Sequence, residues 1–240
     1  MVAKTFERCS SIVFDNAPAR PVHDAANFTN RQEHPDMSTT GPRLEAQSPA
    51  RIGARDLALV SVFAALIAVL TLVPAVPVGA LGVPITLQTM GVALTAMILG
   101  SKRGGSAVAL YLVVGLAGVP IFAKFSGGLG SLASPSAGYL LSFPVAALVT
   151  GALATLVLRK VARRRRFAWL FLAGLAGSIL VVHPLGILGM SLNAQIPLGQ
   201  AFVLDMAYWP GDVVKNLLAA AIAVSVFKAF PAFAARRFQA

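Results

Sequence analysis

Six apolar runs, separated by short polar or Pro/Gly-rich stretches, organise the chain from residue 56 onward. They cover residues 57–76, 87–99, 106–119, 139–158, 167–190 and 203–230. A helix of about 20 apolar residues crosses the roughly 30 Å hydrocarbon core of a bilayer. The second run is short for a full span, and the last is interrupted near Pro210. The pattern predicts an all-α integral membrane protein with six transmembrane helices.

The composition agrees with this prediction and argues against an enzyme. The chain is 57% hydrophobic and 12% charged, whereas soluble domains carry about 25% charged residues. No HExxH pair, phosphate-binding glycine loop ending in GK[ST], or GxSxG motif occurs in the sequence. The single cysteine, Cys9, excludes an intramolecular disulfide and a multi-cysteine metal site. We therefore expect no catalytic residue, no bound metal and no cofactor.

The first 50 residues differ from the rest. They mix Pro, Asn, Asp, Ser and Arg without periodicity, and contain no apolar stretch typical of a signal peptide. Such a segment cannot bury enough apolar surface to order itself. We predict a disordered extension over residues 1–50 and a membrane domain over 51–240. A start at Met37 is an alternative that would leave only a short leader.

Basic residues predict how the chain crosses the membrane. Residues 51–240 hold fifteen basic and three acidic side chains, and most basic ones lie at 51–55, 102–103, 159–166 and 228–237. With six crossings these clusters lie on one side of the membrane. The connections on the other side carry one basic residue, Lys124. Lys and Arg accumulate on the cytoplasmic side. Both termini are therefore predicted to be cytoplasmic, with the basic clusters near anionic lipid rather than nucleic acid.

The connections on the side of the membrane opposite the basic clusters are unusual loops. Val83–Thr89 alternates apolar and polar residues, which predicts an extended strand. Residues 122–130 are rich in glycine, which permits close approach of a ligand. Irregular backbone at membrane depth persists only where it is buried in protein or lines a cavity. These loops either cap the bundle or form a site, and their position on the side of Asp212 favours a site.

The segment Trp209–Asn216 places ionisable residues beside a long apolar run. Inserting a charged residue costs roughly 2.5–3.5 kcal/mol, and this segment holds both Asp212 and Lys215. Pro210 is suited to the first turn of a restarted helix, where the carboxylate of Asp212 is favoured. Lys215 and Asn216 follow on the same helical face. An intrahelical ion pair with a cap is the alternative to a binding site.

Other polar and small residues are predicted to have structural roles. His183 is predicted to be a core histidine whose hydrogen bonds are satisfied within the protein. Asp205 is predicted either to pair with Lys124 or to face the water outside. Ala64 and Ala68 form a small-xxx-small pair of the kind that lets helices approach closely. On an inward face the pair would be ordinary packing, and on an outward face it would dock a partner.

Six motifs in fixed order resemble the BioY family, the biotin-specific substrate-binding (S) components of energy-coupling-factor (ECF) vitamin importers. They cover about residues 55–230. The motifs are Pro84–Thr89, Gly100–Gly104, Tyr111–Phe122, Ser126–Gly130, Pro135–Pro144 and Pro210–Lys215.

The resemblance implies a six-helix S-component bundle with an outward-facing biotin pocket. The pocket would be built from the loop after the first helix, the loop between the third and fourth, and the last three helices. Asp212 and Lys215 would contact the ligand, and Ala64 and Ala68 would dock on a transmembrane coupling subunit carried by two cytoplasmic ABC-type ATPases. Homo-oligomerisation stays open.

The chemistry of biotin suits these residues. A carboxylate such as Asp212 accepts charge-assisted bonds from ureido N–H groups, while Lys215 would donate to the ureido carbonyl or to the carboxylate. Apolar pocket walls are expected from Phe122, Tyr139, Phe143 and Trp209. We also place Gln88, Lys124 and Asn216 among the binding residues.

The predicted function is high-affinity biotin binding for uptake through an ECF transporter, with ATP hydrolysed by partner subunits. An S component for another vitamin, such as thiamine or riboflavin, is the nearer alternative. An intramembrane enzyme that uses Asp212 and His183 as acid and base is the more distant one.

Overall fold

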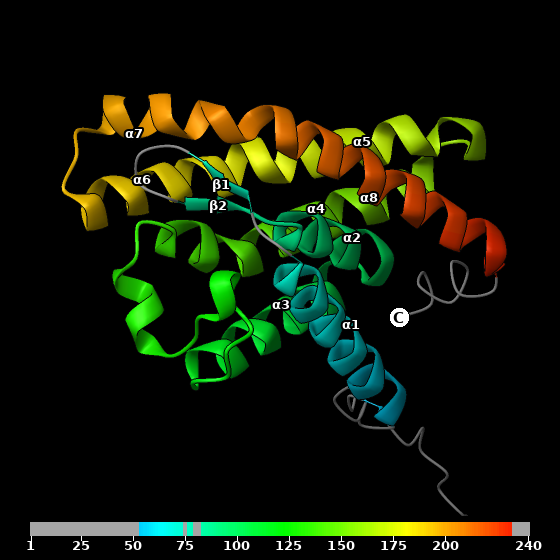
Figure 1. Ribbon diagram of the computed structural model, residues 1–240. Helices are drawn as coiled ribbons and strands as arrows, with labels where there is room; N and C mark the ends of the chain where they lie inside the picture. The colour runs from blue at the N-terminus through cyan, green and yellow to red at the C-terminus, as the bar shows by residue number, and fades with distance from the viewer. Residues whose placement is uncertain (1–52, 74–75, 79–82, 232–240) are drawn as a thin grey trace, which may run out of the picture. The chain divides into compact units, whose positions relative to one another are not determined.

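The computed structural model describes residues 53–73, 76–78 and 83–231 (Figure 1). The predicted extension over residues 1–50, the alternative start at Met37 and the basic residues Arg51, Arg236 and Arg237 lie outside these ranges. Everything below concerns the membrane domain.

Each apolar run contains at least one helix. The first four helices are α1 (Ala54–Leu72), α2 (Gln88–Leu99), α3 (Ser101–Leu116) and α4 (Ala137–Lys160). The fifth run forms α5 (Arg166–Gly177), a π-helical turn (Ser178–Val182) and α6 (His183–Ala194). The sixth forms α7 (Leu198–Asp205), a 3-10 turn (Met206–Tyr208) and α8 (Trp209–Ala229).

Four helical segments among the described residues are long and apolar enough to cross a membrane. They cover 54–72, 137–160, 163–194 and 198–229, with 19, 24, 32 and 32 residues. The all-helical membrane architecture is thereby confirmed. The interruption near Pro210 is only a 3-10 turn, because Met206, Tyr208 and Trp209 all keep right-handed helical backbone angles.

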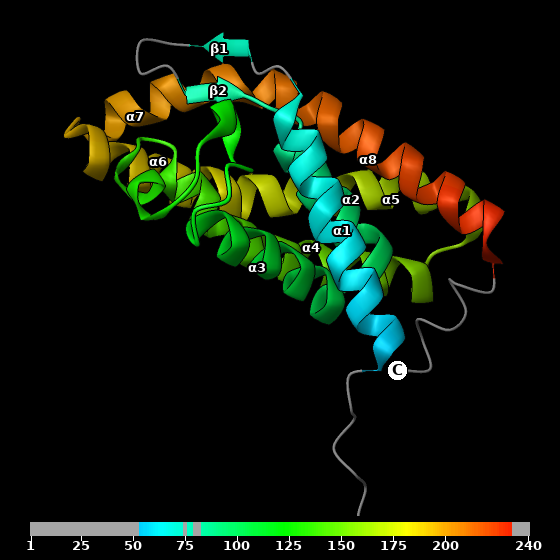
Figure 2. The same ribbon diagram turned by 60° about the horizontal axis from the view of Figure 1, so that its bottom comes forward.

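The helix α2 has 12 residues, which is short for a full span, and it lies inside the bundle. Every residue from Met90 to Leu99 is buried. Helices α1, α3, α4 and α8 pack around it (Figure 2). A helix that is apolar on all sides is expected to be enclosed by protein, which explains its uniform sequence.

The connection after α1 is partly extended, as predicted. Strands β1 (Val76–Val78) and β2 (Val83–Ile85) pair antiparallel, with Pro77 opposite Pro84. The predicted strand ends at Ile85, earlier than expected, because Gln88 already begins α2. The connection between α3 and α4 contains 3-10 turns at Ala123–Phe125 and Leu129–Ala133.

The expected docking role of Ala64 and Ala68 does not fit the structure. Ala64 is 7% exposed and belongs to a buried cluster with Ile67 and Ala96, against which Ala68 also packs. Both alanines face the bundle, so their small size serves close packing between helices. The exposed small residues of α1 include Ala58 and Ala65.

The clusters of basic residues and the Pro/Gly-rich loops occupy opposite ends of the bundle. Arg103 in the first turn of α3 pairs with Asp56 in the first turn of α1, 2.9 Å apart. Residues 159–166 join α4 to α5 at this same end, away from β2 and the 120–136 connection (Figures 1 and 2). Lys102 and Arg103 were expected in a loop but lie within α3.

Candidate binding site

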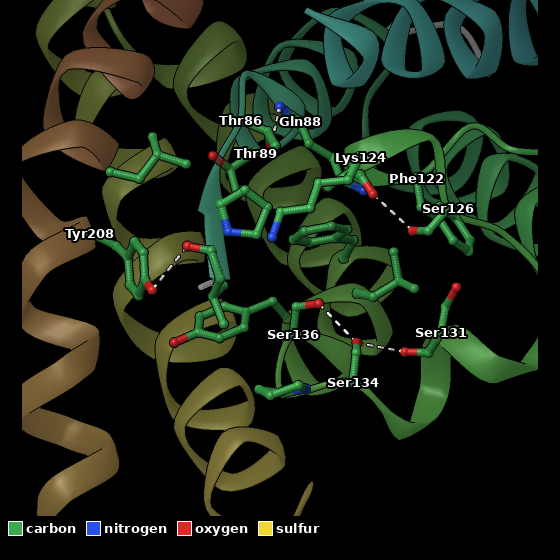
Figure 3. A pocket seen from close by; sticks show the side chains of 18 of the residues that line it. Thr86, Gln88, Thr89, Phe122, Lys124, Ser126, Ser131, Ser134, Ser136 and Tyr208 are labelled. Carbon is green, nitrogen blue, oxygen red and sulfur yellow. Dashed lines mark hydrogen bonds between the residues drawn. The ribbon is translucent and has the colours of Figure 1, made fainter. Parts of the chain in front are cut away.

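A cavity of about 460 Å³ lies where the loops meet the starts of α2, α4 and α8 (Figure 3). Ligand pockets usually measure about 300–1,000 Å³, so a small molecule fits. Both loop segments predicted to form a site, residues 83–89 and 122–130, contribute to its lining, whereas the connection at residues 191–202 does not. The polar and charged lining residues are Thr86, Gln88, Thr89, Lys124, Ser126, Ser131, Ser134, Ser136, Tyr139, Tyr208, Asp212 and Lys215.

Asp212, Lys215 and Thr89 form a closed triangle in the cavity wall. The Lys215 ammonium donates to Asp212 Oδ1 at 2.9 Å and to Thr89 Oγ1 at 3.2 Å. The Thr89 hydroxyl in turn donates to Asp212 Oδ1 at 3.2 Å. Asp212 and Lys215 are 5% and 8% exposed. Pairing and hydrogen bonding offset part of the cost of burying their charges.

The start of α8 explains why these residues face inward. Asp212, Lys215, Asn216 and Ala219 are buried, whereas the residues between them, including Val213, are exposed. This spacing puts them on one helical face, as the sequence predicts. Pro210 lies in the first turn of α8, where its missing N–H removes no intrahelical bond, and Asp212 occupies the same turn beside the positive end of the helix dipole.

Two aromatic side chains form walls because glycines leave room for them. Phe122 is 3% exposed and meets Tyr111 edge-on, with ring centroids 5.5 Å apart. A Cβ at Gly115 would collide with the Phe122 ring, and one at Gly186 would collide with Tyr139. Small residues at these two positions therefore shape the cavity.

Lys124 reaches the cavity from a tight turn. Lys124 and Phe125 have φ angles of 59° and 55°, a left-handed conformation that costs roughly 1–3 kcal/mol per non-glycine residue. The turn is closed by a hydrogen bond from the Phe122 N–H to the Ser126 carbonyl, 2.9 Å long. Residues held in this way cluster at ligand-binding segments, which is consistent with the predicted role of Lys124.

Serine hydroxyls line the side formed by the 129–136 loop. The Ser134 hydroxyl donates to the Ser131 carbonyl at 2.7 Å and lies 2.9 Å from the Ser136 hydroxyl. Asn193 on α6 holds the loop by donating to the carbonyls of Leu132 and Ser134, both at 2.8 Å. Ser131 Oγ is buried and has no hydrogen-bond partner among the described residues. This loop therefore offers polar groups to a ligand on a fixed backbone.

Gln88 links the cavity to the core. Its side-chain amide donates to the Tyr111 hydroxyl at 2.8 Å, and that hydroxyl donates to the Ile121 carbonyl at 3.0 Å. The Thr71 hydroxyl lies 3.3 Å from the same Tyr111 oxygen. These bonds tie α1, α2 and the end of α3 together beneath the cavity.

A second polar cluster lies behind Tyr139 and is centred on Asp205. Asp205 is fully buried and accepts bonds from the Tyr139 hydroxyl at 2.6 Å and the Trp209 indole N–H at 2.8 Å. His183 Nδ1 lies 2.9 Å from Asp205 Oδ2. The expectation that Asp205 pairs with Lys124 or faces water is wrong, whereas the reading of His183 as a buried, satisfied histidine is confirmed.

Seven of the nine residues predicted to bind ligand or to form a pocket wall line the cavity: Gln88, Phe122, Lys124, Tyr139, Phe143, Asp212 and Lys215. Trp209 and Asn216 do not. Trp209 turns towards Asp205, and its ring lies 5.5 Å from that of His183. The Asn216 amide donates to the Ser178 hydroxyl at 3.0 Å and to the Asp212 carbonyl at 2.9 Å.

Sequence reasoning missed Thr89, Tyr208 and the cluster around Asp205. Thr89 was within the predicted extended segment, but its pairing with Asp212 depends on how α2 packs against α8. Tyr208 is 9% exposed and donates to the Val83 carbonyl at 3.3 Å. Its place beside Trp209 was the available signal.

The fold and the cavity together define an integral membrane protein with a small-molecule pocket at one end of a helical bundle. The BioY family model matches residues 38–232. The biotin transporter BioY of Rhizobium etli is 38% identical over 183 residues, which cover 76% of this chain and 98% of that one. The biotin transporter BioY of Rhodobacter capsulatus is 39% identical over 184 residues, covering 72% and 93%. The chain belongs to the BioY family.

A solved structure has the same fold. The crystal structure of the S-component for biotin from an ECF-type ABC transporter superposes with a TM-score of 0.66 at 25% sequence identity. The match covers 75% of this chain and 95% of that structure.

Proposed function

We propose that this protein binds biotin with high affinity and delivers it across the membrane as the S component of an ECF transporter. The observation that carries the proposal is the buried Asp212–Lys215–Thr89 triangle in the wall of a ligand-sized cavity. Membership of the BioY family supports biotin as the ligand.

The cavity suits both ends of biotin. A ureido ring offers two N–H donors and one carbonyl acceptor, which match the Asp212 carboxylate and a donor such as Lys215 or Thr89. Bonds to charged groups are the stronger kind. The Phe122 and Tyr139 walls suit the thioether ring and the aliphatic chain. Lys124 and the serine side chains line the same cavity and suit the ligand carboxylate.

The protein would work as a binding subunit, with transport energy supplied by other chains. Its sequence contains no phosphate-binding GK[ST] loop. The partners in this proposal are a transmembrane coupling subunit and two cytoplasmic ABC-type ATPases, as the resemblance implies. The proposed role requires no catalytic residue and no cofactor in this chain.

In the proposed topology the chain crosses a bacterial cytoplasmic membrane six times, with both termini in the cytoplasm. The distribution of basic residues supports this orientation, because they gather at the end of the bundle opposite the cavity. The cavity would then open outward, towards the substrate.

Calorimetry on the purified protein tests the ligand. Biotin should bind tightly, while thiamine and riboflavin should not bind. Tight binding of either of those vitamins in place of biotin would favour the alternative S-component assignment. Biotin recovered after incubation should be chemically unchanged, whereas a transformed product would favour the enzyme alternative.

Partner docking is expected to use the exposed face of α1. Ala58→Trp and Ala65→Trp should impair biotin uptake by cells that also produce the partner subunits, while leaving biotin binding in detergent unchanged. Both side chains are exposed, so a bulky replacement would obstruct a partner without disturbing the bundle. Ala64→Trp is the contrasting variant, because overpacking that buried site should cost about 1–3 kcal/mol of stability. Normal uptake by both exposed variants would contradict docking on this face.

A further inference from the structure

Gln88 lies where the cavity meets the core, at the start of α2. Its side chain lines the cavity and is 6% exposed. The amide Nε2 donates to the Tyr111 hydroxyl at 2.8 Å. Tyr111 is 1% exposed and packs behind Phe122, which is itself a lining residue. A side-chain amide has a donor end and an acceptor end, so this bond determines which end of Gln88 a ligand meets.

The single hydroxyl hydrogen of Tyr111 fixes the direction of this bond. Two further oxygens contact the hydroxyl: the Ile121 carbonyl at 3.0 Å and Thr71 Oγ1 at 3.3 Å. The Thr71 hydrogen is already donated to the Ile67 carbonyl, 2.7 Å away, so both of these oxygens are acceptors. The Tyr111 hydrogen is therefore used on that side, and the lone pairs of its oxygen need a donor. Gln88 Nε2 supplies it.

The opposite orientation of the Gln88 amide is disfavoured. With Oε1 against Tyr111, the hydroxyl hydrogen would have to turn towards Gln88. The Ile121 carbonyl would then lose the hydrogen that it accepts at 3.0 Å, and a polar group left unpaired away from water is costly. The orientation of the amide is therefore set by bonds in the core, before any ligand arrives.

The other end of the amide, Oε1, faces the cavity. Within the described residues, the side-chain bond that Gln88 forms uses Nε2. The buried side-chain polar atoms without a hydrogen-bond partner there are Thr95 Oγ1, Ser131 Oγ and Asn216 Oδ1. Gln88 Oε1 is not one of them, so it keeps some accessible surface. Because Gln88 lines the cavity, that surface is open to a ligand (Figure 3).

A cyclic urea needs such an acceptor. Its two N–H bonds diverge on opposite sides of the ring, so one carboxylate does not accept from both at once. Asp212 is joined to the start of α2 by the Thr89 hydroxyl, which donates to Oδ1 at 3.2 Å. Gln88 and Thr89 are consecutive in α2, and consecutive side chains of a helix point about 100° apart. Two acceptors thus border the cavity from different directions.

We propose that Tyr111 is a positioning residue that holds the Gln88 amide with its oxygen towards the cavity, where this oxygen accepts an N–H group of the ligand. Tyr111 itself does not touch the ligand in this arrangement. Without the hydroxyl the amide is free to turn, and in part of the molecules its NH₂ end meets the ligand donor. The inference rests on the proposed function, because it takes the ureido group of biotin as the partner of Gln88.

A double-mutant cycle tests whether Tyr111 acts through Gln88. Tyr111→Phe removes only the hydroxyl and should weaken biotin binding about tenfold, as measured by calorimetry in detergent. Gln88→Met keeps the length of the side chain without its amide and should weaken binding about 10–100-fold. Adding Tyr111→Phe to Gln88→Met should then change the affinity by less than about twofold. A purely structural role of Tyr111 predicts the same tenfold loss in both backgrounds, and that result would overturn the proposal.

Thr95→Val is the matched control. Thr95 lies on the same helix as Gln88, is fully buried, and its hydroxyl has no hydrogen-bond partner among the described residues. Removing this hydroxyl should leave biotin affinity unchanged. A loss as large as that of Tyr111→Phe would mean that any hydroxyl removed from the core disturbs the cavity, and it would count against a specific role of Tyr111.

Nuclear magnetic resonance on the ¹⁵N-glutamine-labelled protein tests the orientation of the amide without any ligand. In the wild type, the side-chain NH₂ group of Gln88 should lie in contact with the Tyr111 ring. One of its hydrogens should exchange with solvent at least about tenfold more slowly than in Tyr111→Phe. An NH₂ group that does not contact the ring would overturn the proposal from the wild-type protein alone, and so would equal exchange in the two proteins.

The two hypotheses fail in different ways. If the wild-type protein binds biotin tightly and the losses from Tyr111→Phe and Gln88→Met are additive, the positioning role is wrong and the proposed function stands. If biotin does not bind while the Gln88 NH₂ group is held against Tyr111, the proposed ligand is wrong and the orientation of the amide stands.

Discussion

Asp212→Asn and Lys215→Ala are each expected to weaken biotin binding at least about 100-fold. Removing one partner of a buried, hydrogen-bonded charge pair costs about 2–5 kcal/mol, and 2.7 kcal/mol corresponds to that factor. Asp212→Asn replaces a charged acceptor facing the cavity with a neutral amide. Lys215→Ala deletes the donor that holds both Asp212 and Thr89. Calorimetry in detergent measures both affinities.

Unfolding must be separated from loss of binding. Leaving one buried charge without its partner destabilises a protein by about 3–5 kcal/mol. The single variants are therefore compared with a double variant that lacks both charges. The double variant Asp212→Asn/Lys215→Met removes both charges and keeps their approximate volumes. It should unfold at a temperature closer to wild type than Lys215→Ala does, yet still fail to bind biotin. Tight binding by the double variant would exclude the triangle as the ligand contact.

The helices were predictable because membrane insertion imposes a simple requirement on the sequence. Every backbone polar group in lipid must be satisfied within the segment, so long apolar runs become helices, as α1 and α4 do. The short run at 87–99 was also recognisable, but its enclosure by four other helices depends on tertiary packing. No local pattern in α2 distinguishes burial in protein from burial in lipid.

The charged members of the site were predictable for a related reason. Asp212 and Lys215 stand out in an apolar segment, and their spacing fixes a common face. Asp205 was equally conspicuous, yet its partners come from α4, α6 and α8 and depend on how those helices cross. For Ala64 the sequence showed the pair of small residues, but it did not show that the pair lies on the face of α1 that packs against the bundle.

Trp209 illustrates how a correct local motif can mislead. It directly precedes the proline that opens α8, and an aromatic ring there suits a ligand wall. In the structure its indole N–H bonds to Asp205, one helical turn earlier. The neighbouring Tyr208 faces the cavity instead, because consecutive residues of a helix point about 100° apart.

The contact between α4 and α6 gives the second large expected effect, because it fixes the geometry of the site. Gly138 and Gly189 lie backbone to backbone, and a Cβ at Gly189 would collide with the Gly138 backbone. Gly138 directly precedes Tyr139, which lines the cavity and bonds to Asp205. Any separation of these helices therefore moves Tyr139 relative to the Asp205 cluster and the cavity wall.

Gly189→Ala is expected to lower stability by about 1–3 kcal/mol, the usual cost of overpacking. That loss corresponds to a fall of about 3–10 °C in the unfolding temperature for a domain of this size. Biotin affinity should fall together with stability, because the collision is with backbone atoms and cannot be relieved by a side-chain rotation. Thermal unfolding in detergent, with and without biotin, measures both effects.

Gly199→Ala is the matched control for this prediction. Gly199 lies in the first turn of α7, is exposed, and has no atom within 4 Å of an added Cβ. Alanine there should leave binding unchanged and stability equal or slightly higher, since alanine favours a helix by up to about 1 kcal/mol over glycine. If Gly189→Ala behaved like this control, close packing of α4 on α6 would not be what holds the cavity wall in place.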